Sequence, residues 1–360
     1  MAKVSEQKIV VIGGYGTFGS LISEQLHNSA NLVIAGRNEE AGEKFADSID
    51  AKFVLCNVKD KQALQNAISG ASIVINASGS FLPNDYSIPE ICIEKKCHYM
   101  DLADNREYVK EFKQLYSMAK AKKVFACTGA STTPAVTYAL ISELRAQFSN
   151  IHSIKIYLSA GNKNNAGVST FESILSYVGV PIRVWTNGQW ELFSGWGLPE
   201  IVDFPLPVGK RFVQLCDVPD LELFPKLFKA NEVIFKAGVE LPVFNIGLSV
   251  LAQTKKHISQ IDLKSLAKPL VKVSRLFKNF GSFSGGALVK LEDKNGNRKS
   301  LALVTSQNGP RIPTSAVVLI AKKILSNGPP AHGAFPCVGF ISLDEFQNYL
   351  EPFGIKLISK

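Results

Sequence analysis

The chain has 360 residues, of which 46% are hydrophobic and 20% charged, as in a folded protein with room for two domains. No apolar leader precedes the first predicted strand and no apolar stretch is long enough to cross a bilayer, so we expect neither a signal peptide nor a transmembrane helix. The net charge of +9 is spread along the chain, which argues against nucleic-acid binding. Six scattered cysteines lack paired metal-ligand spacing, so we predict reduced thiols, no metal and a cytoplasmic protein.

A glycine-rich turn follows the first predicted strand. The apolar run Ile9 to Ile12 is typical of a buried parallel strand. Gly14, Gly16 and Gly19 then have the G-x-G-x-x-G spacing of a dinucleotide-binding turn. We expect Gly14 to permit the tight turn, Gly16 to admit a pyrophosphate and Gly19 to bring the next helix close to the strand. The N-terminus of that helix would then face the phosphates.

The end of the second predicted strand indicates which dinucleotide binds. An NAD-binding unit usually has an acidic residue there, which bonds the ribose hydroxyls. Here Gly36 is followed by Arg37, whose guanidinium offers a planar fork of donors to a ribose 2′-phosphate. We therefore predict that Arg37 binds the 2′-phosphate of NADP(H), with NAD as a possible second cofactor. The alternative is that Arg37 is an ordinary solvated arginine.

The first 130 residues alternate strands and helices, which predicts an α/β Rossmann domain with a doubly wound parallel sheet. We expect its six strands at residues 8–13, 31–36, 51–56, 72–77, 98–102 and 123–127. Ligands of such sheets bind at the carboxyl ends of the strands. The chemistry-bearing residues of the chain are therefore expected after these strands.

Three charged residues follow the fifth predicted strand. Asp101 ends this strand and is the first candidate for proton transfer, with Asp104 as the second. Arg106 is a candidate partner for a substrate carboxylate. The alternative for Asp104 is structural, because Asp104 and Glu107 have the spacing of a capping box at a helix N-terminus.

The turn after the sixth predicted strand supplies further candidates. Thr133 and Pro134 are expected to begin a helix, as N-cap and first helical residue. Ser131 and Thr132 are then expected to face the nicotinamide or the substrate.

Residues 131–311 have a different pattern, which predicts a second α+β domain built on an antiparallel sheet. Asn187-Gly188 and Asn295-Gly296 each lie between strand-like runs, as in β-hairpins. We expect further strands near 153–159 and 232–240, and helices near 167–179, 245–256 and 260–279. A helix at about 312–326 is expected to pack on the first domain, and residues 327–360 form a C-terminal segment.

The predicted helix around Leu263 to Phe280 is both apolar and basic. Its apolar residues recur every three or four positions and are Leu263, Leu266, Leu270, Val273, Phe277 and Phe280, with lysines and an arginine between them. One interpretation is contact with an anionic membrane surface. The other is a helix that packs its apolar stripe into the core and leaves a cationic side in solvent, which is the more usual pattern.

Six segments together resemble the saccharopine dehydrogenase-like oxidoreductases, over nearly the whole chain. They read GGYGTFG, VIAGRN, VINASG, HYMDLADNREY, TGASTTPAVT and AGNKNNAGVSTFESILSYVG. The resemblance implies an NADP-binding Rossmann domain, an α+β catalytic and dimerisation domain, and hydride transfer at a carbon–nitrogen bond of a small-molecule imine or secondary amine. The cofactor residues that it implies are Gly14, Gly16, Thr17, Phe18, Gly19, Arg37, Asn38, Asn57, Val58, Ala77, Ser78 and Gly79.

Two observations keep other functions open. Saccharopine reductases have a Gly-Leu-Asp-Pro-Gly turn after strand six, whereas residues 129–135 read GASTTPA, so the substrate differs or the chain is a cofactor-binding regulator without turnover. Tyr116 and Lys120 have the Tyr-x-x-x-Lys spacing of short-chain dehydrogenases, which would indicate a ketone or enoyl reductase. This pair lies one strand–helix unit too early for that active site.

Overall fold

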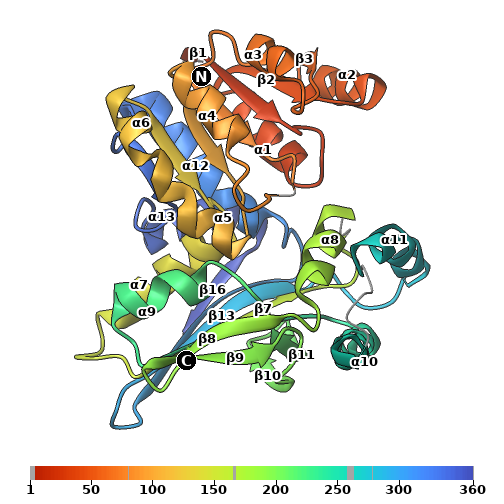
Figure 1. Cartoon of the computed structure of the whole chain (residues 1–360), viewed down its shortest axis with the longest axis vertical. Coiled ribbons are helices and arrows are strands. Elements are labelled where there is room, and N and C mark those ends of the chain that lie inside the picture. Colours follow the sequence, from red (N-terminus) through yellow and green to blue (C-terminus); the bar gives the residue numbers. More distant parts are fainter. Residues whose placement is uncertain (1–4, 80, 165–167, 258–262, 278, 360) are drawn as a thin grey trace. The chain divides into compact units, whose positions relative to one another are not determined.

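The computed structural model describes residues 5–79, 81–164, 168–257, 263–277 and 279–359 (Figure 1). Residue contacts divide the chain into two units. The first contains Met1–Ala135 and Pro313–Phe346, and the second contains Val136–Ile312 and Gln347–Lys360. The C-terminal segment expected at 327–360 is thus shared between the units. Among the described helices, none is both long and apolar enough to cross a membrane.

The first unit is built on a parallel sheet, with helices on both faces, which confirms the predicted Rossmann-type fold. Its strand order is β15-β6-β5-β4-β1-β2-β3. The strands are β1 (Ser5–Ile12), β2 (Ala30–Gly36), β3 (Lys52–Leu55), β4 (Ile73–Asn76), β5 (His98–Asp101), β6 (Phe125–Thr128) and β15 (Gly333–Pro336). The apolar run of β1 is central because β2 and β4 both pair with it, and Val10 lies opposite Val33 and Val74.

The helices of the first unit connect these strands. They are α1 (Gly19–Leu26), α2 (Glu39–Ser48), α3 (Lys61–Ala67), α4 (Ser87–Glu94), α5 (Arg106–Glu111), α6 (Tyr116–Ala121), α12 (Arg311–Asn327) and α13 (Leu343–Leu350), and α12 and α13 continue into the second unit. Polar side chains begin several of them: Asn38 caps α2 and Asp60 caps α3. Side-chain acceptors at these positions satisfy N–H groups that have no partner within the helix.

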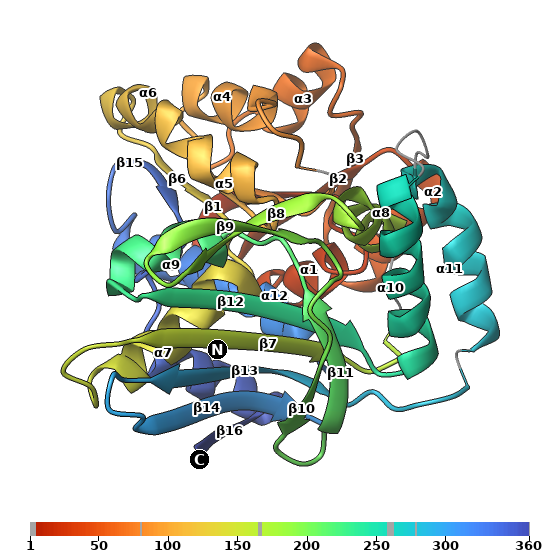
Figure 2. The ribbon, with the colours of Figure 1, turned by 60° about the horizontal axis from the view of Figure 1, so that its bottom comes forward.

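The second unit contains a mixed sheet in the order β10-β11-β12-β7-β13-β14-β16, with the β8–β9 hairpin attached to β12. Its strands are β7 (Ser153–Ala160), β8 (Pro181–Thr186), β9 (Gln189–Ser194), β10 (Glu200–Phe204), β11 (Gly209–Leu215), β12 (Glu232–Val239), β13 (Gly285–Glu292), β14 (Arg298–Thr305) and β16 (Lys356–Ser359). Figure 2 shows the central strands side by side. Most pairs are antiparallel, as predicted, but β7 and β12 are parallel.

Both predicted hairpins of the second unit are confirmed. Asn187 and Gly188 join β8 to β9 with φ angles of 52° and 75°, which suit a turn that needs positive φ. The turn containing Gly296, with φ of 83°, joins β13 to β14. A buried cluster that includes Tyr157, Phe204 and Leu288 forms part of the core of this sheet.

The helices of the second unit are α7 (Thr137–Arg145), α8 (Val168–Tyr177), α9 (Asp220–Phe228), α10 (Pro242–His257) and α11 (Ala267–Leu276). The single helix expected at 260–279 is instead a 3-10 turn, Leu263–Leu266, followed by α11. Residues 260–262 and 278 of that prediction lie outside the described residues.

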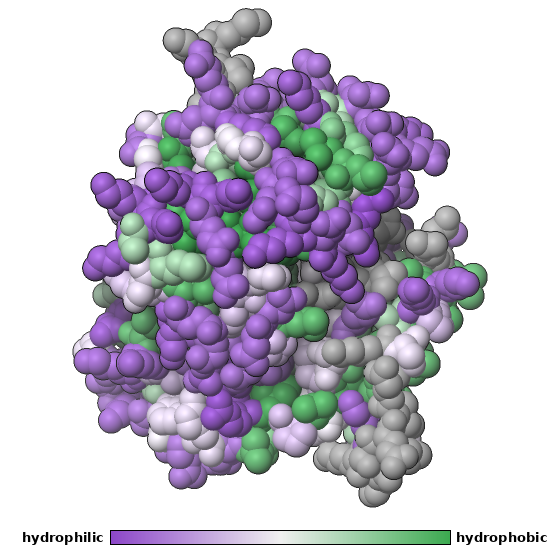
Figure 3. All heavy atoms as spheres, turned by 45° about the horizontal axis from the view of Figure 1, so that its top comes forward, coloured by the Kyte–Doolittle hydropathy of each residue, from purple (hydrophilic) through white to green (hydrophobic). Residues whose placement is uncertain are grey.

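The surface drawn in Figure 3 is mainly hydrophilic, with hydrophobic residues in separate patches. The six cysteines are all buried, and none of them is in a disulfide.

Candidate cofactor site

The glycine-rich turn joins β1 to α1 at the carboxyl end of the sheet. Gly13 has a φ of +74°, and its N–H donates to the carbonyl oxygen of Ala35 at 2.7 Å. A Cβ atom on Gly13 would lie 2.9 Å from Cα of Ser78. The turn therefore depends on Gly13, and the expectation that Gly14 provides it is wrong, because the left-handed conformation falls one residue earlier.

Gly16 and Gly19 keep this turn compact. The N–H of Gly16 donates to the carbonyl oxygen of Gly13 at 2.9 Å, and a Cβ on Gly19 would lie only 2.1 Å from that same oxygen. The first turn of α1 has no acidic residue. This backbone cradle, at a helix N-terminus without opposing negative charge, fits the pyrophosphate of a dinucleotide. Thr17 and Phe18 lie in the same turn, where Thr17 is exposed.

Tyr15 covers the end of β2. A Cβ on Gly36 would lie 2.3 Å from the Tyr15 ring, so Gly36 leaves room for this ring. The Tyr15 hydroxyl accepts a hydrogen bond from the backbone N–H of Asn38 at 2.9 Å. On its other side the ring contacts Phe53 of β3, with ring centroids 6.3 Å apart. Tyr15 is a site residue that the sequence analysis missed.

Arg37 and Asn38 lie beside this tyrosine and have different surroundings. The Asn38 side chain accepts from the N–H of Ala41 at 3.0 Å and so caps α2. Arg37 is exposed, and among the described residues its guanidinium has no hydrogen-bond or ion-pair partner. Arg37 is therefore available to a phosphate, whereas the side-chain oxygen of Asn38 already has a structural role. The acidic residues Glu39 and Glu40 follow in the first turn of α2, so the attraction for a phosphate depends on Arg37.

The loop after β3 contains Asn57 and Val58. Asn57 is exposed, and its side chain accepts from the N–H of Lys59 at 3.2 Å. Its carbonyl oxygen accepts from Asp60, which forms the turn into α3. Val58 is half-buried at this edge of the sheet. The structure thus places both residues at the carboxyl edge.

The loop after β4 is held by a buried asparagine that the sequence analysis did not single out. Asn76 accepts from the hydroxyl of Ser78 at 2.6 Å and from its N–H at 3.1 Å. Ala77 donates its N–H to Ile12 of β1, and Gly79 has a φ of +77°. The sequence feature that could have identified Asn76 is a polar residue at the end of the apolar strand Ile73–Asn76. The loop of Ala77, Ser78 and Gly79 therefore lies beside the glycine turn. The backbone of Ser78 is so close to Gly13 that there is no room for a Cβ atom on Gly13.

Asp101 joins the ends of β5 and β6. Its Oδ1 accepts from the Thr128 hydroxyl at 2.8 Å, the Gly129 N–H at 2.9 Å and the Ala103 N–H at 3.0 Å. The side chain has no exposed surface, and burial raises its pKa to about 6 even though these hydrogen bonds favour the ionised form. Asp101 is therefore placed to hold two loops of the carboxyl edge.

The residue that caps helix α5, in the segment after Asp101, is not the one expected from the sequence. Asn105, and not Asp104, caps α5, because its side chain accepts from the N–H of Tyr108 at 3.0 Å. The capping-box interpretation of Asp104 and Glu107 is therefore wrong. Asp104 is exposed. Arg106 is only 4% exposed, and its role as a partner for a substrate carboxylate stays a prediction.

The turn after β6 leads into a helix. Thr133 has an extended backbone, with φ of −104° and ψ of 126°, as an N-cap residue has, and the helical segment Thr132–Val136 that contains it runs into α7. These angles agree with the expectation that Thr133 precedes a helix beginning at Pro134. Thr132 is buried and Ser131 is partly exposed, so Ser131 is the more accessible of the two candidates.

Tyr116 and Lys120 lie at the other end of the sheet. The Tyr116 ring contacts Phe335 of β15 at 5.6 Å, and a Cβ on Gly333, the first residue of β15, would meet this ring. Lys120 Nζ lies 5.6 Å from the Tyr116 ring centroid. Because the cofactor turn is at the carboxyl ends of the parallel strands, this pair is not placed as in a short-chain dehydrogenase.

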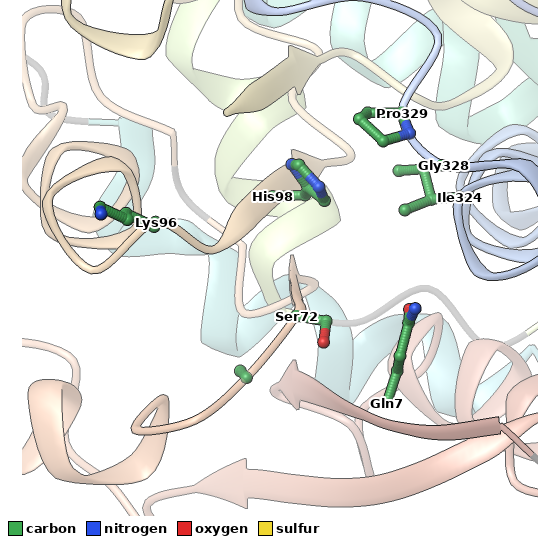
Figure 4. Close-up of a pocket in the computed structure, with 8 residues that line it drawn as sticks. Gln7, Ser72, Lys96, His98, Ile324, Gly328 and Pro329 are labelled. Carbon is green, nitrogen blue, oxygen red and sulfur yellow. The ribbon is translucent and has the colours of Figure 1, made fainter. Parts of the chain in front are cut away.

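A hollow of about 310 Å³ also lies at the amino-terminal ends of the strands. Ser72, Lys96, His98 and Gly328 are among the residues that line it (Figure 4). His98 accepts from the Phe125 N–H, and burial lowers its pKa. The hollow is therefore separate from the cofactor edge. Among the described residues, no group of histidines, cysteines and acidic residues is arranged to hold a metal ion.

Comparison with known proteins identifies the first unit. Residues 9–127 match the family model of the saccharopine dehydrogenase NADP binding domain. The first unit is therefore similar to the NADP-binding domain of saccharopine dehydrogenases. The edge formed by the glycine turn and Arg37 lies within the matched residues. Comparison of the whole sequence with curated proteins gives no match.

The structure is also similar to saccharopine dehydrogenase (L-Glu forming) from Saccharomyces cerevisiae. The similarity covers 98% of this chain and 99% of that chain, with a TM-score of 0.69 and 12% identity. At this identity the likeness shows the fold, and it confirms a Rossmann unit followed by an α+β unit. Ribose-5-phosphate isomerase from Brucella melitensis 16M has 16% identity and covers 35% of this chain and 69% of that chain, but its TM-score is only 0.30.

Proposed function

We propose that the protein is an NADP(H)-dependent oxidoreductase that transfers hydride at a carbon bonded to nitrogen, in an imine or a secondary amine. The observation that carries this proposal is an exposed Arg37 without a partner among described residues, placed where an NAD-binding domain has an acid. The match of residues 9–127 supports NADP(H) as the cofactor. The saccharopine dehydrogenase fold of the whole chain supports the carbon–nitrogen substrate class.

Binding of the cofactor would use the residues at the carboxyl edge of the sheet. The turn from Gly13 to Gly19 would hold the pyrophosphate, and Arg37 would bind the 2′-phosphate. The loop of Ala77 and Ser78 would lie against the cofactor with small side chains. When bound, NADP(H) supplies or accepts the hydride. The chain itself must orient the substrate and exclude water.

A proton must also move at the substrate nitrogen, and two aspartates of this edge have different surroundings. Asp101 is fully buried, and its Oδ1 already accepts three hydrogen bonds. Asp104 is exposed in the loop that leads to α5. We therefore assign the proton transfer to Asp104 and a positioning role to Asp101. This reverses the order of preference drawn from the sequence.

The test is a turnover assay that follows NADPH absorbance with matched panels of cyclic imines, ketones and enoyl compounds. We expect oxidation of NADPH with imines, and reduction of NADP with the corresponding secondary amines. Turnover confined to ketones or enoyl compounds would contradict the substrate class and support a reductase of another kind. Tight NADPH binding without turnover on any panel would contradict an enzymatic function and support a regulatory NADP-binding protein.

A further inference from the structure

Helices α10 and α11 lie next to each other in the second unit. The Phe244 ring of α10 meets the Phe277 ring, which follows α11, edge to face with centroids 5.3 Å apart. Figure 2 shows the two helices side by side near the ends of β7 and β12. The Asn162 side chain, after β7, donates to the carbonyl oxygens of Phe277 and Phe280. The segment after α11 is thus bonded to the loop after β7, whereas α10 contacts β11 and β12.

The face of α11 that packs inward is narrow. Leu263, Ala267 and Val271, spaced four residues apart, are 2%, 1% and 6% exposed. Leu266 and Val273 were expected in the same core stripe but are 37% and 42% exposed. The expectation that the whole apolar stripe packs into the core is therefore wrong.

A second apolar row runs along the outside of α11. Pro269, Val273 and Leu276 are separated by three or four positions, which places them on one side of α11. Leu266, in the 3-10 turn before α11, and Phe280, beyond its end, are also exposed. Leu276 and Phe280 are 75% and 61% exposed. Lys268 and Lys272 are exposed between the members of this row. An apolar row flanked by lysines is the arrangement of a helix that lies in the plane of a membrane surface.

Helix α10 also has exposed apolar residues on one face. Val243, Ile246 and Val250 are 61%, 53% and 59% exposed and are spaced as neighbours on one face. Helix α10 therefore exposes an apolar face, and the exposed lysines beside the apolar residues, Lys268 and Lys272, belong to α11.

The net positive charge of residues 241–280 indicates which kind of partner would bind this face. Between Leu241 and Phe280 the sequence has seven basic residues and a single acidic one, Asp262; the basic residues are Lys255, Lys256, Lys264, Lys268, Lys272, Arg275 and Lys278. A second copy of the chain would bring like charges together, which opposes self-association through this face. A nucleic acid would match the charge but not the apolar row. An anionic lipid surface matches both.

We propose that the outward face of α10 and α11 docks on anionic phospholipid membranes. The apolar side chains enter the boundary between headgroups and acyl chains, and the lysines meet lipid phosphates. This surface belongs to the second unit and does not depend on the cofactor site. It makes the protein a peripheral membrane protein that binds reversibly.

The test is co-sedimentation of the full chain with vesicles of phosphatidylcholine alone or with 30% phosphatidylglycerol, a fraction of about a third that gives a strongly anionic surface. We expect binding to the anionic vesicles and little to the neutral ones, with weaker binding at high salt. Val273→Glu/Leu276→Glu and Lys268→Gln/Lys272→Gln should each weaken partition at least about tenfold. Melting temperatures close to wild type would show that the variants fold.

Matched controls separate this face from general exposure and charge. Leu192→Glu/Ile201→Glu changes two apolar side chains that are each 69% exposed on β9 and β10, and Lys294→Gln/Lys299→Gln changes two exposed lysines near the β13–β14 turn. Both controls should bind vesicles as the wild type does. Equal loss in the controls, or no vesicle binding by wild type, would overturn the proposal. A dimer that dissociates in Val273→Glu/Leu276→Glu, or duplex DNA binding lost with the lysines, would instead assign the face to a second copy or to nucleic acid.

Discussion

The Tyr15 hydroxyl accepts the backbone N–H of Asn38 at 2.9 Å, next to the exposed Arg37. This bond uses the hydroxyl oxygen as an acceptor and leaves its hydrogen to donate elsewhere. Within the described ranges that hydrogen has no acceptor. The Tyr15 ring lies against the backbone of Gly36, which has no side chain to displace it, and it also contacts the Phe53 ring. These two contacts hold the ring in place. If Arg37 binds a phosphate as proposed, Tyr15 could therefore donate to the same group.

The Tyr15→Phe variant tests this role. It keeps the ring that covers Gly36 and removes one donor, which for a bond to a charged group reduces affinity by about tenfold or more. We expect weaker NADPH binding and unchanged NADH binding, measured by fluorescence titration. Tyr116→Phe, which removes a hydroxyl at the amino end of the sheet, serves as the control. Equal weakening for both cofactors would mean that Tyr15 supports the turn and does not recognise the phosphate.

The Arg37→Ser variant tests the charge at the end of β2. Loss of a guanidinium that binds a phosphate should weaken NADPH binding by about 10- to 100-fold and bring it close to NADH binding. Lys44→Ser removes an exposed charge from α2 and should leave both affinities unchanged. If Arg37→Ser binds NADPH as tightly as wild type, Arg37 is an ordinary solvated arginine, which was the alternative left open by the sequence.

Asp101 predicts a pH dependence of stability. Burial raises its pKa from 3.8 to about 6, so the folded state binds more protons than the unfolded state between these values. The contribution of Asp101 to the free energy of unfolding is thus greatest below about pH 4. It decreases by up to about 3 kcal/mol as the pH rises through 6.

Asp101→Asn keeps an oxygen acceptor for Thr128 and Gly129 but cannot ionise. We expect the melting temperature of this variant, relative to wild type, to rise as the pH is increased from 4 to 7. Asp220, another buried carboxyl with a pKa raised to about 7 by burial, is present in both proteins and does not affect the difference. Parallel profiles for the two proteins would show that Asp101 has an ordinary pKa.

Proton transfer is tested by the Asp104→Asn variant. If Asp104 moves the proton at the substrate nitrogen, kcat should fall by about 10²- to 10⁴-fold with NADPH affinity unchanged. Asp50→Asn, at an exposed position far along the chain from this loop, should be fully active. Full activity in Asp104→Asn, together with loss in a stably folded Asp101→Asn, would return proton transfer to Asp101.

The sequence predicted those elements whose pattern is local. The apolar run of β1 is buried on both faces, and its period alone indicated a parallel strand. The hairpin at Asn187-Gly188 was equally clear, because few residues tolerate two successive positive φ angles. The six strands of the first 130 residues appeared within a few positions of their predicted limits.

The remaining features depend on contacts between distant residues. Strand β15 has only four residues and forms by pairing with β6, about 200 residues earlier, so no local pattern reveals it. The sequence analysis assigned the tight turn to Gly14 and not to Gly13. The need for glycine at position 13 comes from the backbone of Ser78, which is 65 residues later and leaves no room for a Cβ atom. The prediction for α11 failed because Leu266 and Val273 have the same spacing as the buried residues of this segment. Which side of α11 is buried depends on its contact with α8, and the sequence pattern does not show that contact.

The most direct test of the central claim is a calorimetric titration of the wild-type protein with NADPH and with NADH. We predict one site per chain, with NADPH bound at least about tenfold more tightly because Arg37 and Tyr15 both meet the 2′-phosphate. Equal or tighter binding of NADH, or no binding of either dinucleotide, would contradict the assignment of this edge as an NADP(H) site.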